Sequence, residues 1–213
     1  MKIKFSHVAH WVFDLDNTLY PPEAALFDQI EVKMTSYVMR ELKVDHARAN
    51  YLRDHYWQKY GTTLSGMMAE HDVDPLPYLT EVHDISLDHM QQDLILRGHI
   101  QNLPGRKIVY TNGSEFHANR VLESRGLGGV FDAIYGIEHS DFKPKPGRDA
   151  YDVIVARDNI ETTQAAMFED DPRNLEIPHD MGMRTVLIGP PDARPYIHHQ
   201  TEDLTDFLSQ LVG

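Results

Sequence analysis

The sequence predicts an α/β protein in which a parallel sheet covered by helices carries an inserted, all-helical cap. Three observations lead to this prediction. Short apolar strands alternate with helical segments from residue 106 onward, a first apolar strand stands far upstream at 8–13, and the long stretch between them has apolar residues at helical spacing. We expect a catalytic core of residues 1–20 and 101–213 and a cap of residues 21–100.

The first strand ends in a pair of acidic residues. Residues 8–13 are almost continuously apolar and β-prone, which is typical of a buried strand, and Asp14 and Asp16 follow in FDLDNTLY. Ligands of open parallel sheets bind at the carboxyl ends of the strands, so this motif is placed at a candidate site.

The cap segment begins and ends at turn signals. Pro21-Pro22 opens it, NLPG at 102–105 closes it, and Asp45 is a plausible N-cap inside it. Apolar residues recur at helical spacing in two runs, Leu26, Ile30, Met34, Tyr37 and Val38, and then Leu52, Tyr56 and Tyr60. Both runs predict helices.

The remaining core segments follow a strand-helix rhythm. They are RKIVYTN, EFHANRVLESRGL, FDAIYGI, KPGRDAYDVIVARDNI, AAMFEDD, RTVLIG and a terminal EDLTDFLSQLVG. Alternation of this kind predicts parallel strands joined by covering helices, with EDLTDFLSQLVG as a last helix.

Composition excludes several classes of protein. The chain has 213 residues, with 20 Lys and Arg against 33 Asp and Glu, and its formal charge of −13 disfavours polynucleotide and anionic membrane surfaces. It contains no cysteine, so thiolate metal sites are excluded. The N-terminal segment lacks the features of a signal peptide, and no stretch is long and apolar enough to span a membrane. We expect a cytoplasmic monomer or small homo-oligomer.

Three more polar clusters fall where the rhythm places strand ends or helix starts. Thr111, Asn112 and Gly113 follow KIVY and precede a helix, which suits a phosphate at a helix N-terminus. Lys143 lies in DFKPKP ahead of the next helix, with Lys145 as the less favoured alternative, and Asp170-Asp171 ends AAMFEDD. Carboxylates, a lysine and an amide-rich turn are therefore predicted to meet at one edge of the sheet.

In this order, DxDxT, a strand-ending Thr, a Lys before Pro and a strand-ending Asp pair resemble the four motifs of the haloacid dehalogenase superfamily. The resemblance implies a Rossmann-like core. It implies that Asp14 is a nucleophile forming an aspartyl-phosphate and that Asp16 is the general acid and then base. The implied Mg²⁺ ligands are Asp14, the carbonyl of Asp16, and Asp170, while Asp171 is left open between direct and water-mediated contact.

The resemblance also implies a phosphate-binding set. Thr111 and Lys143 would bind the phosphate, and Asn112 and Gly113 would offer amides to it. Elementary chemistry agrees with the assigned roles, because a carboxylate attacks an anionic phosphate only where a cation such as Mg²⁺ reduces the repulsion. We further expect crowding by acidic neighbours to raise the pKa of Asp16, so that it can protonate the leaving oxygen.

Two other interpretations of the acidic motif fit poorly. An EF-hand loop would have Gly and Glu where this chain has Leu19 and Ala25. A haloalkanoate dehalogenase has no leaving group that needs the proton of Asp16. The thirteen histidines also supply no convincing zinc set by their spacing.

Within the superfamily, DNTLYPP, YWQKYGTTLSGMM, HDVDPLPYL, VYTNG and FEDDPRN resemble the pyrimidine 5′-nucleotidase branch. The expected substrate is a small phosphate monoester, and at least one ring among Tyr56, Trp57 and Tyr60 is expected to bind it by stacking on its base. Three alternatives stay open: a phosphatase of a sugar phosphate or other small metabolite, a phosphomutase, and a non-catalytic regulator that binds a phosphometabolite.

Overall fold

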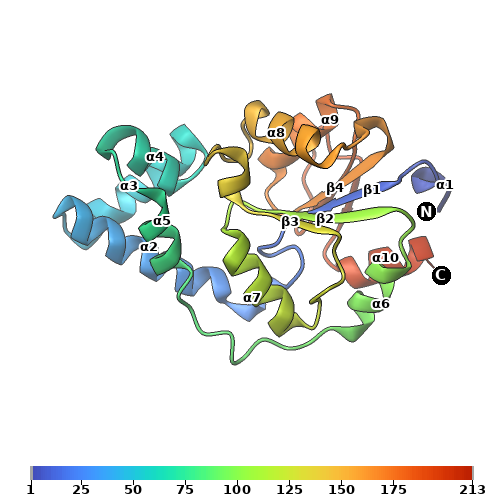
Figure 1. Cartoon of the computed structure of the whole chain (residues 1–213), viewed down its shortest axis with the longest axis horizontal. Helices are drawn as coiled ribbons and strands as arrows, with labels where there is room; N and C mark the ends of the chain where they lie inside the picture. Colours follow the sequence, from blue (N-terminus) through green and yellow to red (C-terminus); the bar gives the residue numbers. More distant parts are fainter. Residues whose placement is uncertain (1, 213) are drawn as a thin grey trace.

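A six-stranded parallel sheet with the order β3-β2-β1-β4-β5-β6 forms the centre of the computed structural model, which describes residues 2–212 (Figure 1). Each neighbouring pair of strands is parallel. The strands are β1 (His10–Phe13), β2 (Arg106–Tyr110), β3 (Ala133–Tyr135), β4 (Ala165–Glu169), β5 (Arg184–Ile188) and β6 (His199–Thr201). The predicted fold class, a Rossmann-like parallel sheet with a helical cap, is confirmed.

Helices cover both faces of this sheet, because successive side chains of a buried strand point to opposite sides. On one face, Trp11 and Phe13 belong to an apolar cluster with α7 (Glu115–Arg125) and α10 (Leu204–Val212). On the other face, Val12 belongs to a second cluster with α8 (Arg148–Asp158). Figure 1 shows α8 and α9 on one side of the strands and α7, α6 and α10 on the other.

The cap is a group of four helices that follows β1 and lies to one side of the sheet (Figure 1). Its helices are α2 (Leu26–Leu42), α3 (His46–Tyr60), α4 (Thr63–His71) and α5 (Pro75–Val82). Asp45 is the N-cap of α3, as predicted, and its side chain accepts a hydrogen bond of 2.8 Å from the backbone N–H of Arg48. Thr62 and Asp74 cap α4 and α5 with their side chains in the same way, whereas α2 has no side-chain cap.

The helix α6 (Leu94–Asn102) lies almost wholly within the predicted cap range of 21–100, yet it packs against α10 beneath the sheet. The reason is its apolar face, since Leu96 and Ile100 are buried in the same cluster as Leu204. We therefore propose that the cap ends before α6 and that this helix belongs to the core.

Several short elements were not predicted. They are α1 (Lys2–Phe5), α9 (Glu176–Asp180), β6, and the 3₁₀ turns Pro22–Ala24, Ile137–Ser140, Thr162–Gln164 and Pro172–Leu175. Segments of three to five residues are too short to show a hydrophobic period, so sequence patterns do not detect them. Met1 and Gly213, which the predicted core range and the terminal helix include, lie outside the described residues. Within residues 2–212, no helix combines the length and apolar character that a membrane span requires.

Candidate active site

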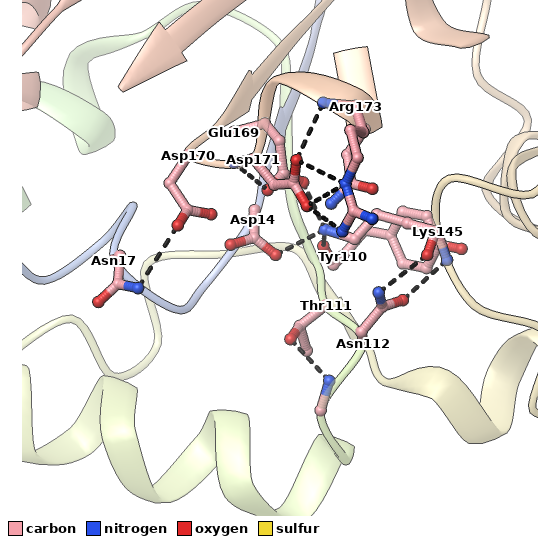
Figure 2. A network of polar contacts seen from close by, with 12 residues as sticks. Asp14, Asn17, Tyr110, Thr111, Asn112, Lys145, Glu169, Asp170, Asp171 and Arg173 are labelled. Carbon is pink, nitrogen blue, oxygen red and sulfur yellow. Dashed lines mark hydrogen bonds and ion pairs between the residues drawn. The ribbon is translucent and has the colours of Figure 1, made fainter. Parts of the chain in front are cut away.

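The carboxyl ends of β1, β2 and β4 bring the predicted motifs together. Phe13 of β1 lies opposite Val109 of β2 and Phe168 of β4 in the parallel register. The residues that follow these positions therefore share one edge of the sheet, and Figure 2 shows Asp14, Thr111 and Asp170 converging there. The predicted convergence of strand-end side chains occurs.

Lys145 is the cation at the centre of this group. Its Nζ donates hydrogen bonds of 2.6 Å to Asp14 Oδ1, 2.6 Å to Glu169 Oε2 and 3.1 Å to the carbonyl of Tyr110. The side chain is 1% exposed. Burial by itself lowers the pKa of a lysine, but the charges of Asp14 and Glu169 outweigh it and the pKa of Lys145 is raised. Lys145 thus carries a positive charge inside the site.

The prediction that Lys143 is the site lysine is wrong. Lys143 is half exposed, and its Nζ pairs with Asp149 at 3.4 Å on the surface. Asn112 explains the difference, because its amide oxygen accepts a 2.8 Å hydrogen bond from the N–H of Lys145 and its amide nitrogen donates one of 3.1 Å to the carbonyl of Lys145. These two bonds hold the backbone of Lys145 against the strand ends (Figure 2). Because the two lysines are only two residues apart, the sequence alone does not show which of them enters the site; the contact with Asn112 does.

Glu169 is a site residue that the sequence analysis missed. It ends β4 and is 1% exposed, and its second oxygen, Oε1, accepts a 3.2 Å hydrogen bond from the N–H of Asp171. Its position could have revealed it. An acidic residue that ends a strand of otherwise apolar residues is expected to be buried and therefore to need a charged partner. Lys145 is that partner.

Three carboxylates in this group could hold a metal ion. One oxygen each from Asp14, Glu169 and Asp170 lies within 4.8 Å of the others. Burial, together with the charge of Glu169, raises the pKa of Asp14 well above its usual range and raises that of Asp170 to about 10. Lys145 alone therefore leaves negative charge uncompensated. A hard divalent cation with oxygen ligands fits this donor set.

Asp170 and Asp171 have different surroundings. Asp170 Oδ2 accepts a hydrogen bond of 3.4 Å from the side-chain amide of Asn17. Asp171 instead receives the guanidinium of Arg173 at 2.6 Å, together with a hydrogen bond from the N–H of Arg173 at 3.0 Å. Figure 2 shows Asp171 and Arg173 paired beside the acidic group. Of the two aspartates, Asp170 is the one placed with Asp14 and Glu169.

Asp16 lies beside the acidic group but has hydrogen-bond donors of its own. Its Oδ1 accepts hydrogen bonds of 2.6 Å from the Tyr20 hydroxyl and 3.4 Å from His117 Nε2. Burial favours the neutral carboxyl, but the hydrogen bonds from His117 and Tyr20 outweigh it, so the pKa of Asp16 is lowered. The expectation of a raised pKa is therefore wrong for the free protein, because the sequence did not show these two donors.

The turn after β2 leads into α7, but the amide that Gly113 was expected to offer to a phosphate is bonded within the turn. Thr111 is buried, and its hydroxyl oxygen accepts a 2.9 Å hydrogen bond from the N–H of Gly113. Ser114 then caps α7, where its hydroxyl oxygen accepts a hydrogen bond from the N–H of His117. A turn that ends at a helix N-terminus presents backbone N–H groups to an anion.

A cavity of about 570 Å³ lies between these strand ends and the cap. Its core wall includes Asp14, Asp16, Thr111, Asn112, Gly113, Lys145 and Asp170, and its cap wall includes Phe27, Ile30, Met34, Arg53, Trp57, Tyr78, Leu79 and Val82. Polar groups thus gather at one end and mostly apolar groups at the other. Such a cavity suits a small ligand with one polar and one apolar end.

The three predicted substrate-binding rings have different surroundings. Tyr56 is fully buried within the cap, where its hydroxyl meets His71 Nε2 at 2.7 Å. The hydroxyl of Tyr60 donates to Glu70, and its ring lines a separate outer groove. Trp57 lines the cavity, and the guanidinium of Arg173 lies 3.5 Å from its ring centroid. Of the three, Trp57 is the ring in reach of a ligand.

Comparison with known proteins places these features in a family. Residues 11–188 match the family described as haloacid dehalogenase-like hydrolase. Over 191 residues the chain is 26% identical to phosphate metabolism protein 8 of Saccharomyces cerevisiae, an alignment that covers 82% of this chain and 60% of the yeast protein. The chain therefore spans less than two thirds of that relative.

Solved structures share the fold. One is the HAD hydrolase YfnB from Bacillus subtilis, described as bound to magnesium, with a TM-score of 0.65, 14% identity, and coverage of 96% of this chain and 98% of that one. Another is a HAD phosphatase from Thermococcus onnurineus, with a TM-score of 0.64, 16% identity, and coverage of 97% and 99%. At these identities the likeness shows the shared fold.

Proposed function

Because the chain belongs to the haloacid dehalogenase-like hydrolase family, we propose that it is a Mg²⁺-dependent phosphomonoesterase that acts on a pyrimidine 5′-nucleotide through an aspartyl-phosphate. The observation that carries this proposal is the different bonding of two neighbouring carboxylates. Asp14 is bound by the buried Lys145, whereas Asp16 receives hydroxyl and imidazole donors on one oxygen. Two carboxylates with such separate environments suit two separate roles.

In the proposed reaction, Asp14 attacks the phosphorus of the substrate. Lys145 holds Asp14 Oδ1, and among the described residues Oδ2 has no hydrogen bond, so Oδ2 is the attacking oxygen. A bond forms between this oxygen and phosphorus while the ester bond to the leaving oxygen breaks. The backbone N–H of Asn112, at the carboxyl end of β2, stabilises the phosphoryl oxygens. Bound Mg²⁺, held by Asp14, Asp170 and the backbone carbonyl of Asp16, would supply positive charge that reduces the repulsion between carboxylate and phosphate.

Asp16 then moves the protons of both half-reactions. An arriving phosphate adds negative charge next to Asp16 and so favours its protonated form. The protonated carboxyl donates to the leaving oxygen, which departs as an alcohol. In the second half-reaction, Asp16 accepts a proton from the water that attacks the phosphorus of the aspartyl-phosphate, and the bond between phosphorus and Asp14 breaks. A dehalogenase would not need this second carboxyl, which supports a phosphatase.

The test of this proposal is phosphate release from a panel of phosphate monoesters. We expect UMP and CMP to have the highest kcat/KM, and activity to require added Mg²⁺ and to stop in excess chelator. Full activity in chelator would contradict the mechanism. Sugar phosphates that outperform every nucleotide would contradict the nucleotide assignment and leave the phosphatase assignment standing.

Asp16→Asn is expected to lower kcat by about 10²-fold or more, which is the usual scale for general acid-base catalysis. An amide can neither donate nor accept the transferred proton, but it keeps the size of the side chain. Substrate binding, measured as the Kd of a non-hydrolysed phosphate analogue, should change little. Unchanged turnover would show that Asp16 has only a structural role.

Trp57→Ala is expected to remove the preference for UMP over ribose 5-phosphate, because stacking of a base on an aromatic ring contributes roughly 1–3 kcal/mol. Hydrolysis of a small aryl phosphate should be spared. Tyr51→Ala is the matched control, since Tyr51 is an exposed ring of the same helix α3. A preference that survives in Trp57→Ala would exclude this ring as the base-binding group.

A further inference from the structure

The two oxygens of Asp16 have unequal surroundings. Both hydrogen-bond donors that reach this carboxylate, the Tyr20 hydroxyl and His117 Nε2, meet the same oxygen, Oδ1. Within residues 2–212, Oδ2 has no hydrogen bond, and Asp16 lines the cavity that also contains Asp14. The carboxyl is therefore held by one oxygen and open at the other.

Tyr20 is built into the core and directed at Asp16. It is 2% exposed, and its hydroxyl donates to Asp16 Oδ1 at 2.6 Å. Burial and the charge of Asp16 raise the pKa of Tyr20 well above its usual value, so the hydroxyl keeps its proton. It is a permanent donor to Oδ1.

His117 supplies the second donor from α7. Its side chain is fully buried, and a carboxylate partner at Nε2 indicates that the ring proton lies on that nitrogen. The ring stacks on His83 at a centroid distance of 4.3 Å and an angle of 11°. His83, the C-cap residue of α5, leaves little room for the His117 ring to turn.

His83 is itself held on the core. The Ser114 hydroxyl lies 3.0 Å from His83 Nδ1, and Arg120 donates hydrogen bonds of 2.8 Å to the carbonyl of His83 and 3.0 Å to that of Ile85. Burial lowers the pKa of His83 to about 3, so this ring is neutral and can lie against His117 without a charge. The segment that follows α5, at His83 and Ile85, is therefore held against the core next to the contact between His117 and Asp16.

We propose that Tyr20 and His117 are positioning residues that direct Asp16 to transfer the proton through Oδ2. Two donors on Oδ1 occupy its lone pairs, so the proton of the neutral carboxyl is placed on the other oxygen. They also restrict rotation of the carboxyl, which keeps Oδ2 toward the leaving oxygen. This inference rests on the proposed function.

The experiment compares two substrates that differ in their need for a general acid. The nucleoside of a nucleotide is a poor leaving group whose oxygen needs a proton, whereas a dinitrophenyl phosphate releases a stable phenolate without one. The measured quantity is kcat/KM, which for both substrates reports the first half-reaction. Tyr20→Phe combined with His117→Leu should lower kcat/KM for the nucleotide by about 10-fold or more and for the dinitrophenyl phosphate by less than about 3-fold.

Conservative variants separate positioning from folding. His117→Gln retains an N–H near the position of Nε2 and should stay within about 3-fold of the wild type on the nucleotide. Phe116→Ala is the control, because Phe116 is exposed on the same helix. Asp16→Asn should show the same substrate dependence as the double variant. If the double variant does not fold, Tyr20→Phe and His117→Gln against His117→Leu give the same comparison singly.

Equal losses on both substrates, or a loss in His117→Gln as large as in His117→Leu, would overturn the inference and assign these residues to folding. Unchanged kcat/KM on the nucleotide would overturn it as well. A wild-type protein that hydrolyses neither substrate would instead overturn the proposed function. The two failures are therefore distinguishable.

Discussion

Lys145→Met is expected to lower kcat for an aryl phosphate by about 10³-fold, whereas Lys143→Met should leave it within about 2-fold of the wild type. The ammonium of Lys145 lies 2.6 Å from both Asp14 and Glu169, and Lys143 lies on the surface against Asp149. The two residues have the same chemistry and are two positions apart, so each variant controls for the other. The measurement is Mg²⁺-dependent phosphate release.

Stability should follow the same contrast. Removal of one partner from a buried ionic group typically costs about 3–5 kcal/mol, because the remaining charges are left uncompensated. Lys145→Met should lower the free energy of unfolding in urea by that order, while Lys143→Met should change it by less than about 0.5 kcal/mol. A Lys143 variant that loses activity, or equal effects of the two variants, would contradict the placement of Lys145 at the centre of the site.

Asp14→Asn is expected to reduce turnover by about 10⁴-fold or more, the scale seen when a catalytic nucleophile is removed. The amide cannot attack phosphorus, and the change removes one of the two carboxylates, Asp14 and Asp170, that are proposed to hold Mg²⁺. The measurement uses a substrate labelled in its phosphoryl group, with the reaction quenched in acid during turnover. The wild-type protein should carry the label as the aspartyl-phosphate, and Asp14→Asn should carry none.

Asp28→Asn serves as the control for that variant, since Asp28 is an exposed carboxylate of α2. It should keep full activity and full labelling. Retained turnover in Asp14→Asn, or label that persists on it, would place the nucleophile elsewhere.

Much of the fold could be predicted because its longer elements have clear periodicity. The buried first strand, the strand-helix alternation after residue 106 and the cap helix after Asp45 are all local patterns that the structure retains. The position of α6 could not be read in this way. Leu96 and Ile100 give it an apolar face, but a helical period does not indicate whether that face meets the cap or, as it does, α10.

The site could be predicted in part for a related reason. Parallel strands align their carboxyl ends, so the common location of Asp14, Thr111 and Asp170 follows from their positions at the ends of predicted strands. Side chains that reach the site from elsewhere do not follow from it. His117 comes from the first turn of α7, and Glu169 ends a strand whose other residues are apolar. Their contacts with Asp16 and Lys145 are known only once the elements are packed.

By itself, the sequence determined the family motifs, the parallel sheet, the helical cap and the edge at which the acidic residues meet. These depend on periodicity and on spacing along the chain. Only the tertiary structure decided between Lys143 and Lys145, through the two hydrogen bonds from Asn112, and only it selected Trp57 from three neighbouring rings. It also reversed the expected pKa shift of Asp16. Each of these depends on contacts between residues distant in sequence, and local patterns carry no information about such contacts.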